Sequence, residues 1–221
     1  MRPVLTAVLV VSSVAWLAWA GSVSEAAPPQ APGSQGAAFA NAAPPCFDGV
    51  NRYVDCGNGT VTDTVTRLIW LRDAACLGQA DWATANTIAA KLKHGDCALS
   101  DGSRAGDWRL ATEFEWTETI ARAVFLNCHG VGGSPPALTN NDGSACLLGS
   151  SQGSGPTDHA FVNVPSGAVC YVFNDRTCTF WTSTTAEAFG TLAVRARLFF
   201  GSANDAVQKS QVYGIWPVRT R

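Results

Sequence analysis

The feature that most constrains this chain is a set of eight cysteines placed behind an N-terminal export signal. Arg2 provides a positive charge, residues 5–18 form a mainly apolar run, and Ala18 and Ala20 are small residues at the spacing of a cleavage site. We predict a signal peptide over residues 1–20 and a secreted, periplasmic or cell-surface protein. Membrane contact is expected only through an uncleaved signal segment. An even number of cysteines in an oxidising compartment predicts disulfides and no free thiols.

The rest of the chain divides by composition into a linker and one domain. Residues 21–45 contain five prolines and many Ala, Gly and Ser residues, which predicts a flexible linker. Residues 46–221 are expected to form a single folded domain. Only 14% of the residues are charged, the net charge is -2, and Lys and Arg are not clustered. These values argue against a charge-rich disordered protein, a coiled coil and a nucleic-acid-binding protein.

Strand and helix signals both occur in the domain. Asn58-Gly59 between two β-prone segments predicts a hairpin, and residues 68–71 predict a buried strand. Asp81 and Thr112 each precede apolar residues at helical spacing, and Thr112 forms a capping box with Glu115, so two helices are predicted. Residues 127–156 are typical of a long loop. Further strands are expected at residues 168–173, 179–183, 191–200 and 211–219, so the pattern predicts an α+β fold with a mostly antiparallel sheet.

The eight cysteines allow roughly a hundred disulfide connectivities, so we predict the pairs from the cysteines expected to lie close together. Cys170 and Cys178 face each other across a predicted hairpin, and a bond between Cys128 and Cys146 would close the long loop. The remaining pairs are then Cys46–Cys56 and Cys76–Cys97.

Basic residues are in excess from Cys170 onward, where a ligand site is predicted. Alternation along residues 191–200 predicts that Arg195 and Arg197 point outward. Arg176 and Lys209 lie in segments expected to be adjacent, and guanidinium groups suit sulfate or carboxylate ligands. Trp181 is the candidate aromatic contact, whereas the core is expected to hold Trp70, Trp82, Trp116 and Trp216. The alternative interpretation is a solvated sheet face with scattered counterions.

Catalytic and metal-binding patterns are incomplete. Residues 149–153 match the G-x-S-x-G nucleophile elbow but lack the strand and helix that it needs. His94, His129 and His159 lack zinc-site spacing, and His94 is interpreted as a cation at a helix C-terminus. Residues 140–143 offer oxygen ligands for Ca²⁺, although such Asx-rich segments are more often plain turns. We predict no cofactor and no metal, and an enzyme using His129 or His159 stays as an alternative.

Six short motifs occur in the order seen in the Lcl C-terminal domain family, which this chain resembles. They are Arg52-Tyr53-Val54-Asp55, Gly59-Thr60-Val61-Thr62-Asp63, Leu68-Ile69-Trp70, Gly106-Asp107-Trp108-Arg109-Leu110, Phe180-Trp181-Thr182-Ser183-Thr184 and Trp216-Pro217-Val218-Arg219. Residues 108–116 are also similar to the stretch that opens the second helix in formylglycine-generating-enzyme-like and C-type-lectin-like folds. The resemblance implies a C-type-lectin-like fold with two helices, a twisted and mostly antiparallel sheet and a long loop region, here stapled by disulfides.

The chain departs from the expected motifs at several positions. Ala111 stands where Pro is usual, and Arg67 stands where Gly is usual. The tripeptides of calcium-dependent sugar-binding lectins are missing, so the resemblance does not imply calcium-mediated sugar binding.

The main functional prediction is an exported, non-catalytic binding or adhesion domain. Its expected ligand is an anionic glycan or a partner protein, because the family is named after the C-terminal domain of a bacterial collagen-like adhesin. That resemblance implies affinity for sulfated polysaccharides. The alternatives are an exported enzyme and a structural envelope protein.

Overall fold

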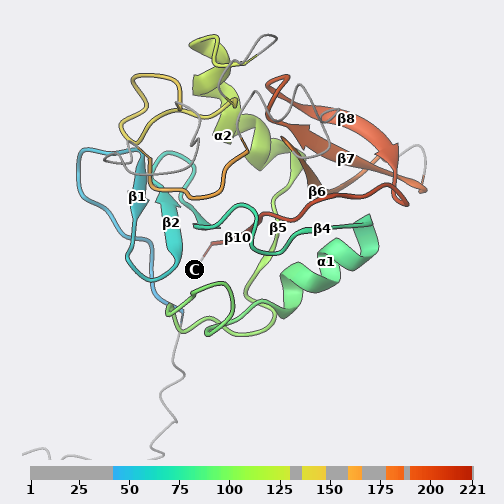
Figure 1. Ribbon diagram of the computed structural model, residues 1–221, viewed down its shortest axis with the longest axis horizontal. Helices are drawn as coiled ribbons and strands as arrows, with labels where there is room; N and C mark the ends of the chain where they lie inside the picture. The colour runs from blue at the N-terminus through green and yellow to red at the C-terminus, as the bar shows by residue number, and fades with distance from the viewer. Residues whose placement is uncertain (1–41, 130–135, 148–158, 166–177, 187–189, 221) are drawn as a thin grey trace, which may run out of the picture. The chain divides into compact units, whose positions relative to one another are not determined.

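The computed structural model describes residues 42–129, 136–147, 159–165, 178–186 and 190–220. In these ranges the chain forms two α-helices and two five-stranded sheets (Figure 1). Three disulfides join described residues, so the fold is the disulfide-stapled α+β fold that the sequence predicts. No helix in the described part of the chain has the length and apolar character needed to cross a membrane.

The first sheet contains five of the six family motifs, and the sixth lies in β6 of the second sheet. Its order is β1 (Tyr53–Asp55), β2 (Thr60–Asp63), β3 (Leu68–Leu71), β10 (Pro217–Arg219) and β5 (Arg109–Leu110), with every neighbouring pair antiparallel. The predicted hairpin is confirmed, because β1 pairs with β2 from Tyr53↔Asp63 to Asp55↔Val61. The C-terminal strand β10 lies between β3 and β5, so residues from both ends of the domain share one sheet.

The second sheet differs more from the prediction. Its order is β4 (Gln79–Ala80), β9 (Tyr213–Gly214), β6 (Thr179–Thr185), β7 (Leu192–Arg197) and β8 (Ser202–Gln208). The single strand expected over residues 211–219 is wrong, because β9 and β10 belong to different sheets. Strand β8 was not predicted, because Ser, Asn, Asp and Gln are poor strand formers. Its pairing with β7 compensates for this low strand propensity. The strand expected at residues 168–173 lies outside the described residues.

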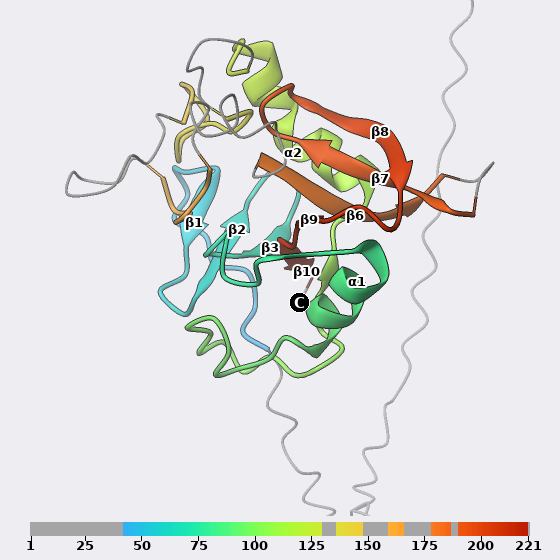
Figure 2. The same cartoon turned by 45° about the vertical axis from the view of Figure 1, so that its right-hand side comes forward.

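Both predicted helices are present with their predicted caps. In α1 (Trp82–Lys91) the Asp81 carboxylate accepts hydrogen bonds from the N–H groups of Ala83 and Thr84. In α2 (Glu113–Phe125) the capping box between Thr112 and Glu115 is complete. Helix α2 packs on the β6–β8 part of the second sheet and α1 lies beside β4 and β5 (Figures 1 and 2). The two helices therefore pack mainly against different strands.

His94 does not have the role that the sequence suggested. Helix α1 ends at Lys91, so His94 lies beyond its last turn. The Nδ1 atom of His94 accepts a hydrogen bond of 3.1 Å from the N–H of Gly102. This contact ties the ring to the loop at Gly102, which follows the helix.

Tryptophans dominate the core. Trp70, Trp116 and Trp216 are fully buried and pack edge to face, with ring centroids 4.8–5.7 Å apart. Among the described residues, the N–H groups of Trp70 and Trp116 have no conventional acceptor, and edge-to-face packing brings such groups toward neighbouring π-faces. Trp82 is only partly buried and lies at the edge of a second apolar cluster, so the prediction that it belongs to the core is wrong.

The disulfides are Cys46–Cys56, Cys76–Cys97 and Cys128–Cys146, which are the pairs favoured by the sequence argument. Cys178 is also disulfide-bonded. Its predicted partner, Cys170, lies outside the described residues.

Candidate functional site

Two arginines of the predicted basic patch share one counterion within the second sheet. Arg195 places Nε and Nη2 at 2.9 and 2.6 Å from one carboxylate oxygen of Asp205, and Nη1 bonds to the hydroxyl of Tyr213. Arg197 lies 3.6 Å from the same carboxylate and stacks on Phe200. Asp205 comes from the unpredicted strand β8, which explains why the sequence did not reveal this counterion. Both arginines are partly buried and alternate with the buried Ala196, as the sequence predicts, but they lie against this counterion.

The other predicted ligand residues are also held by the protein itself. Lys209 donates a 2.8 Å hydrogen bond to the carbonyl of Gly190 and stacks on the ring of Trp82. Trp181 is fully buried, and its indole N–H donates to the carbonyl of Ala80, so its face is covered by the core. Arg176 lies outside the described residues.

The histidines and the Asx-rich turn form no metal site in the described ranges, where no three His, Cys, Asp or Glu side chains come together. His159 is buried, and its Nδ1 bonds to the carbonyl of Phe161. His129 packs against Gly201. The side-chain oxygens of Asn140, Asn141 and Asp142 accept backbone N–H groups, and the Ser144 hydrogen bonds lower the pKa of Asp142.

A broad, open groove of about 1450 Å³ lies elsewhere, between segments far apart in the sequence. It is bordered by the start of the domain, the turn between β2 and β3, the loop before β5, the first turns of α2 and the end of β10. The lining residues are Ala42, Pro44, Pro45, Phe47, Thr64, Val65, Thr66, Arg67, Leu68, Arg104, Asp107, Phe114, Glu115, Glu118 and Thr220.

Large apolar side chains project into this groove without being covered. Phe47 is 61% exposed, Val65 67% and Phe114 71%. Each comes from a different segment, yet all three line the same groove. Apolar side chains gathered in a concave surface with charged neighbours are typical of a ligand-binding site.

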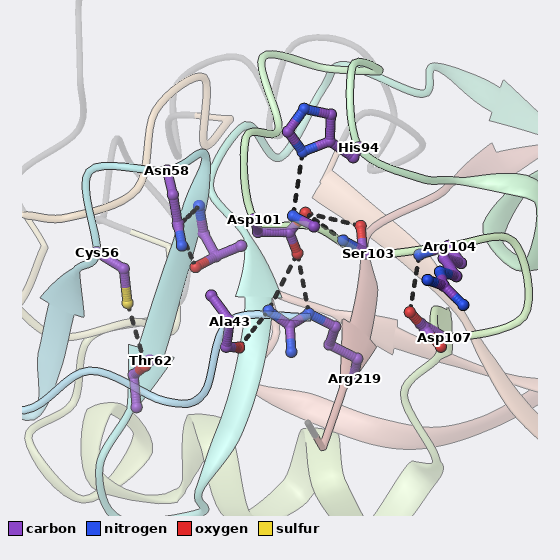
Figure 3. A network of polar contacts seen from close by, with 12 residues as sticks. Ala43, Cys56, Asn58, Thr62, His94, Asp101, Ser103, Arg104, Asp107 and Arg219 are labelled. Atoms are coloured by element: carbon purple, nitrogen blue, oxygen red, sulfur yellow. Dashed lines mark hydrogen bonds and ion pairs between the residues drawn. The ribbon is translucent and has the colours of Figure 1, made fainter. Parts of the chain in front are cut away.

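The N-terminal border of the groove is held by a buried ion pair between Asp101 and Arg219 (Figure 3). Arg219 donates to Asp101 from Nε at 3.1 Å and to the carbonyl of Ala43 from Nη2 at 2.8 Å. The carbonyl of Asp101 accepts the N–H of Ala43. Burial lowers the pKa of Arg219, and Asp101 and Asp107 oppose that shift. Together with the Cys46–Cys56 disulfide, this contact sets the position of the groove wall formed by residues 42–47.

A second buried ion pair holds the opposite border. Arg52 donates from Nε and Nη2 to the two carboxylate oxygens of Asp63, at 3.1 and 2.9 Å, and Nη2 also bonds to the carbonyl of Thr119 in α2. Asp63 accepts the N–H groups of Val65 and Thr66, which line the groove. Burial lowers the pKa of Arg52, but Tyr53, Asp63 and Glu118 raise it above its usual value. Asp63, the last residue of the Gly59–Asp63 motif, therefore also fixes the conformation of the turn between β2 and β3.

The third border contains Glu115, whose carboxylate is fully engaged. Arg109 donates two hydrogen bonds to it, at 2.7 and 2.6 Å, and the N–H of Thr112 donates another at 2.8 Å. Burial raises the pKa of Glu115, but these hydrogen bonds outweigh burial and lower it overall. Glu115 is therefore a helix cap and an ion-pair partner, and it stays ionised near neutral pH.

Arg67 is the residue of the groove that departs most from ordinary backbone geometry. Its φ of +61° lies in the left-handed region, and its N–H bonds to the carbonyl of Asp63 at 2.7 Å. The turn therefore keeps a conformation that suits glycine, although the chain has Arg where the resemblance leads us to expect Gly. Left-handed geometry is uncommon for a long side chain and costs about 1–2 kcal/mol.

Sequence reasoning did not identify the groove, because its residues have no shared motif. The groove residue to which the sequence drew attention is Arg67, which stands at a position where glycine is usual. A model of the Lcl C-terminal domain family matches residues 59–219, which include every border of the groove except residues 42–47 and Thr220. Neither a curated protein nor a solved structure matches the chain, so the C-type-lectin-like fold stays an expectation from the resemblance.

Proposed function

The chain belongs to the Lcl C-terminal domain family, and from that premise we propose that it is an exported, non-catalytic binding module whose ligand docks in the groove. The observation that carries this proposal is the common exposure of Phe47, Val65 and Phe114 around one concave surface. Burying such side chains against a partner removes apolar area from water, which stabilises the complex by about 25 cal/mol per Å² before the costs of association.

The chemistry of the groove supports binding rather than turnover. Glu115 is engaged with Arg109, and Asp107 accepts the N–H of Arg104 at 2.7 Å. His159 is buried and bonded to its own chain, and neither it nor His129 lines the groove. A general acid or base needs a proton-exchanging group within reach of the bound ligand. Glu115 and Asp107 are engaged in holding the walls instead.

The apolar character of the groove favours a partner protein over an anionic glycan. The cations predicted to hold a glycan, Arg195 and Arg197, already share Asp205. The disulfides support an oxidising, extracytoplasmic location, in which such a partner would be another exported or surface protein.

The test is a parallel screen of the exported chain and two variants on a random-peptide library and a glycan array. The first variant is Phe47→Ser/Phe114→Ser, which removes two exposed rings from the groove. The matched control is Phe125→Ser/Val212→Ser, which removes two exposed apolar side chains that do not line it. We expect groove-directed ligands to bind the first variant at least about 10-fold more weakly and the control as tightly as the parent.

Equal binding by all three proteins would refute the assignment of the groove. Anionic glycans that bind these three proteins equally but do not bind a further variant, Arg195→Ser/Arg197→Ser, would transfer the binding site to the second sheet. Circular dichroism and the unfolding temperature show whether each variant is folded at the assay temperature.

A further inference from the structure

The second sheet ends in a long edge strand. Within the described ranges, the first sheet has β1 and β5 at its edges, and the second has β4 and β8 (Figures 1 and 2). Strands β1, β5 and β4 contain only three, two and two residues, whereas β8 contains seven. Short edge strands limit pairing with other chains, and β8 lacks this protection. Its length makes β8 the edge best suited to pair with another strand.

Strand β8 also lacks most of the other features that protect an edge. It contains no proline and no lysine, and its single charge, Asp205, lies 2.6 Å from Arg195 on β7. Lys209 follows the strand, but it donates to a backbone carbonyl and stacks on Trp82. The irregularity in the β7–β8 pairing lies near the beginning of β8, and the pairing is regular from Asp205 to Gln208. The second half of β8 is therefore a regular edge.

The hydrogen-bond register shows which backbone groups of β8 point outward. The N–H of Lys209 donates to the carbonyl of Thr191 at the beginning of β7, with an N···O distance of 2.9 Å. Bonded and non-bonded pairs alternate along an antiparallel ladder, so Val207 also bonds to β7, whereas Ala206 directs its N–H and C=O groups away from β7. These two groups have no hydrogen-bond partner among the described residues, and the side chain of Ala206 is exposed.

We propose that β8 pairs antiparallel with β8 of a second copy of this chain. The two-fold axis of the dimer passes beside Ala206, whose N–H and C=O groups bond to the same residue of the second copy. The two second sheets then form one continuous sheet. This inference goes beyond the proposed function and is independent of it, because no residue of β8 lines the groove.

The side chains of β8 complement themselves in this register. Asn204 lies opposite Gln208 of the second copy, so two amide side chains that can hydrogen-bond face each other. Asp205 lies opposite Val207 of the second copy, so the two carboxylates are not directly opposed, and opposed like charges would destabilise the pairing. The small Ala206 side chains meet beside the axis. A two-fold dimer requires a self-complementary surface of this kind, which favours a second copy over an unrelated strand.

The test is sedimentation equilibrium of the exported chain and its variants over a range of concentrations. Ala206→Lys places two ammonium groups beside the axis and should raise the dissociation constant of the dimer at least about 10-fold. Ala90→Lys is the matched control, since Ala90 is an exposed alanine of α1, and it should dimerise as the parent does.

A second pair of variants tests the backbone bond itself. Ala206→Pro removes the outward N–H and leaves the bonds to β7 in place, so it should weaken the dimer about 10-fold or more. Ala206→Ser keeps the N–H and should dimerise as the parent does. Circular dichroism of the diluted proteins shows whether each variant is folded as a monomer.

Hydrogen exchange of the parent supplies a measurement that needs no variant. The N–H of Ala206 should exchange slowly above the dissociation constant and quickly after dilution, because only the second copy protects it. The N–H of Val207 bonds to β7 and should stay protected at both concentrations.

Three results would overturn the inference. The first is a parent chain that stays monomeric up to its solubility limit, and the second is exchange at Ala206 that does not depend on concentration. The third is a dimer that persists in Ala206→Lys and Ala206→Pro. If that dimer is instead lost in Phe47→Ser/Phe114→Ser, the groove is the interface between the copies and β8 is not.

Discussion

Gly59, at the end of the hairpin loop between β1 and β2, should be much less tolerant of substitution than its neighbour Gly57. Both residues have positive φ, +84° and +68° respectively. An alanine at either position therefore incurs a backbone cost of about 1–2 kcal/mol. The surroundings differ, because a Cβ at Gly57 meets nothing within 4 Å, whereas a Cβ at Gly59 lies 2.6 Å from the carbonyl oxygen of Ala98.

The loop that contains Ala98 has little freedom to move away. It is bonded to Cys76 through the Cys76–Cys97 disulfide, and the N–H of Ser100 donates a 2.9 Å hydrogen bond to the carbonyl of Asn58. The atoms in the way are backbone atoms, so a side-chain rotation cannot remove the clash. Overpacking of this kind typically costs about 1–3 kcal/mol. Gly59→Ala should therefore lose about 1–3 kcal/mol more than Gly57→Ala.

The measurement is thermal and urea unfolding of both variants under non-reducing conditions. For a domain of this size, the extra loss corresponds to an unfolding temperature roughly 2–12 °C lower for Gly59→Ala than for Gly57→Ala. The m-values should match that of the parent, since the amount of surface exposed on unfolding stays the same. Equal unfolding temperatures for the two variants would refute the close approach of the hairpin to the loop at Ala98.

Three further predictions follow from local contacts. Thr112→Ala breaks the capping box and should reduce the free energy of unfolding by about 0.5–2 kcal/mol, measured by urea titration. The folded-state pKa of Glu115 is lowered, so its contribution to stability is complete above its ordinary value of 4.5 and is lost as the pH falls through the folded value. Glu115→Gln should lack that part of the acid dependence, and an unchanged pH profile would contradict the argument. Thiol titration of the denatured, unreduced chain should detect no reactive thiols, and four or more would contradict the predicted disulfides.

The elements that were predicted correctly are those encoded by a few consecutive residues. Asp81 and Thr112 lie within three residues of the N–H groups that they cap, so the beginnings of α1 and α2 depend on local sequence alone. The hairpin likewise depends on the short segment between β1 and β2, in which Gly57 and Gly59 supply the positive φ angles. The predicted export signal and the even number of cysteines indicated disulfides through the chemistry of the compartment rather than through the fold.

Local sequence patterns of this kind could not predict the candidate site. Phe47, Arg67 and Phe114 come from separate segments, and nothing in the sequence shows that they border one groove. Arg195 and Arg197 were chosen because alternation along β7 points them outward, but Asp205 lies opposite on a strand whose residues carry no strand signal. Their shared counterion was not predicted, because counterions are set by pairing across the sheet.

An α+β domain with two capped helices, a hairpin and disulfide staples is predictable from the sequence, because caps, turns and cysteine chemistry act over short distances or through composition. Two other features appear only in the folded chain: Ile215 and Trp216 separate strands of two different sheets, and Asp63 and Asp101 hold the borders of the groove through buried arginines. These features arise from pairing and burial between segments more than ten residues apart along the chain. Such contacts have no periodicity in the sequence, since their energy depends on which surfaces the folded chain brings together.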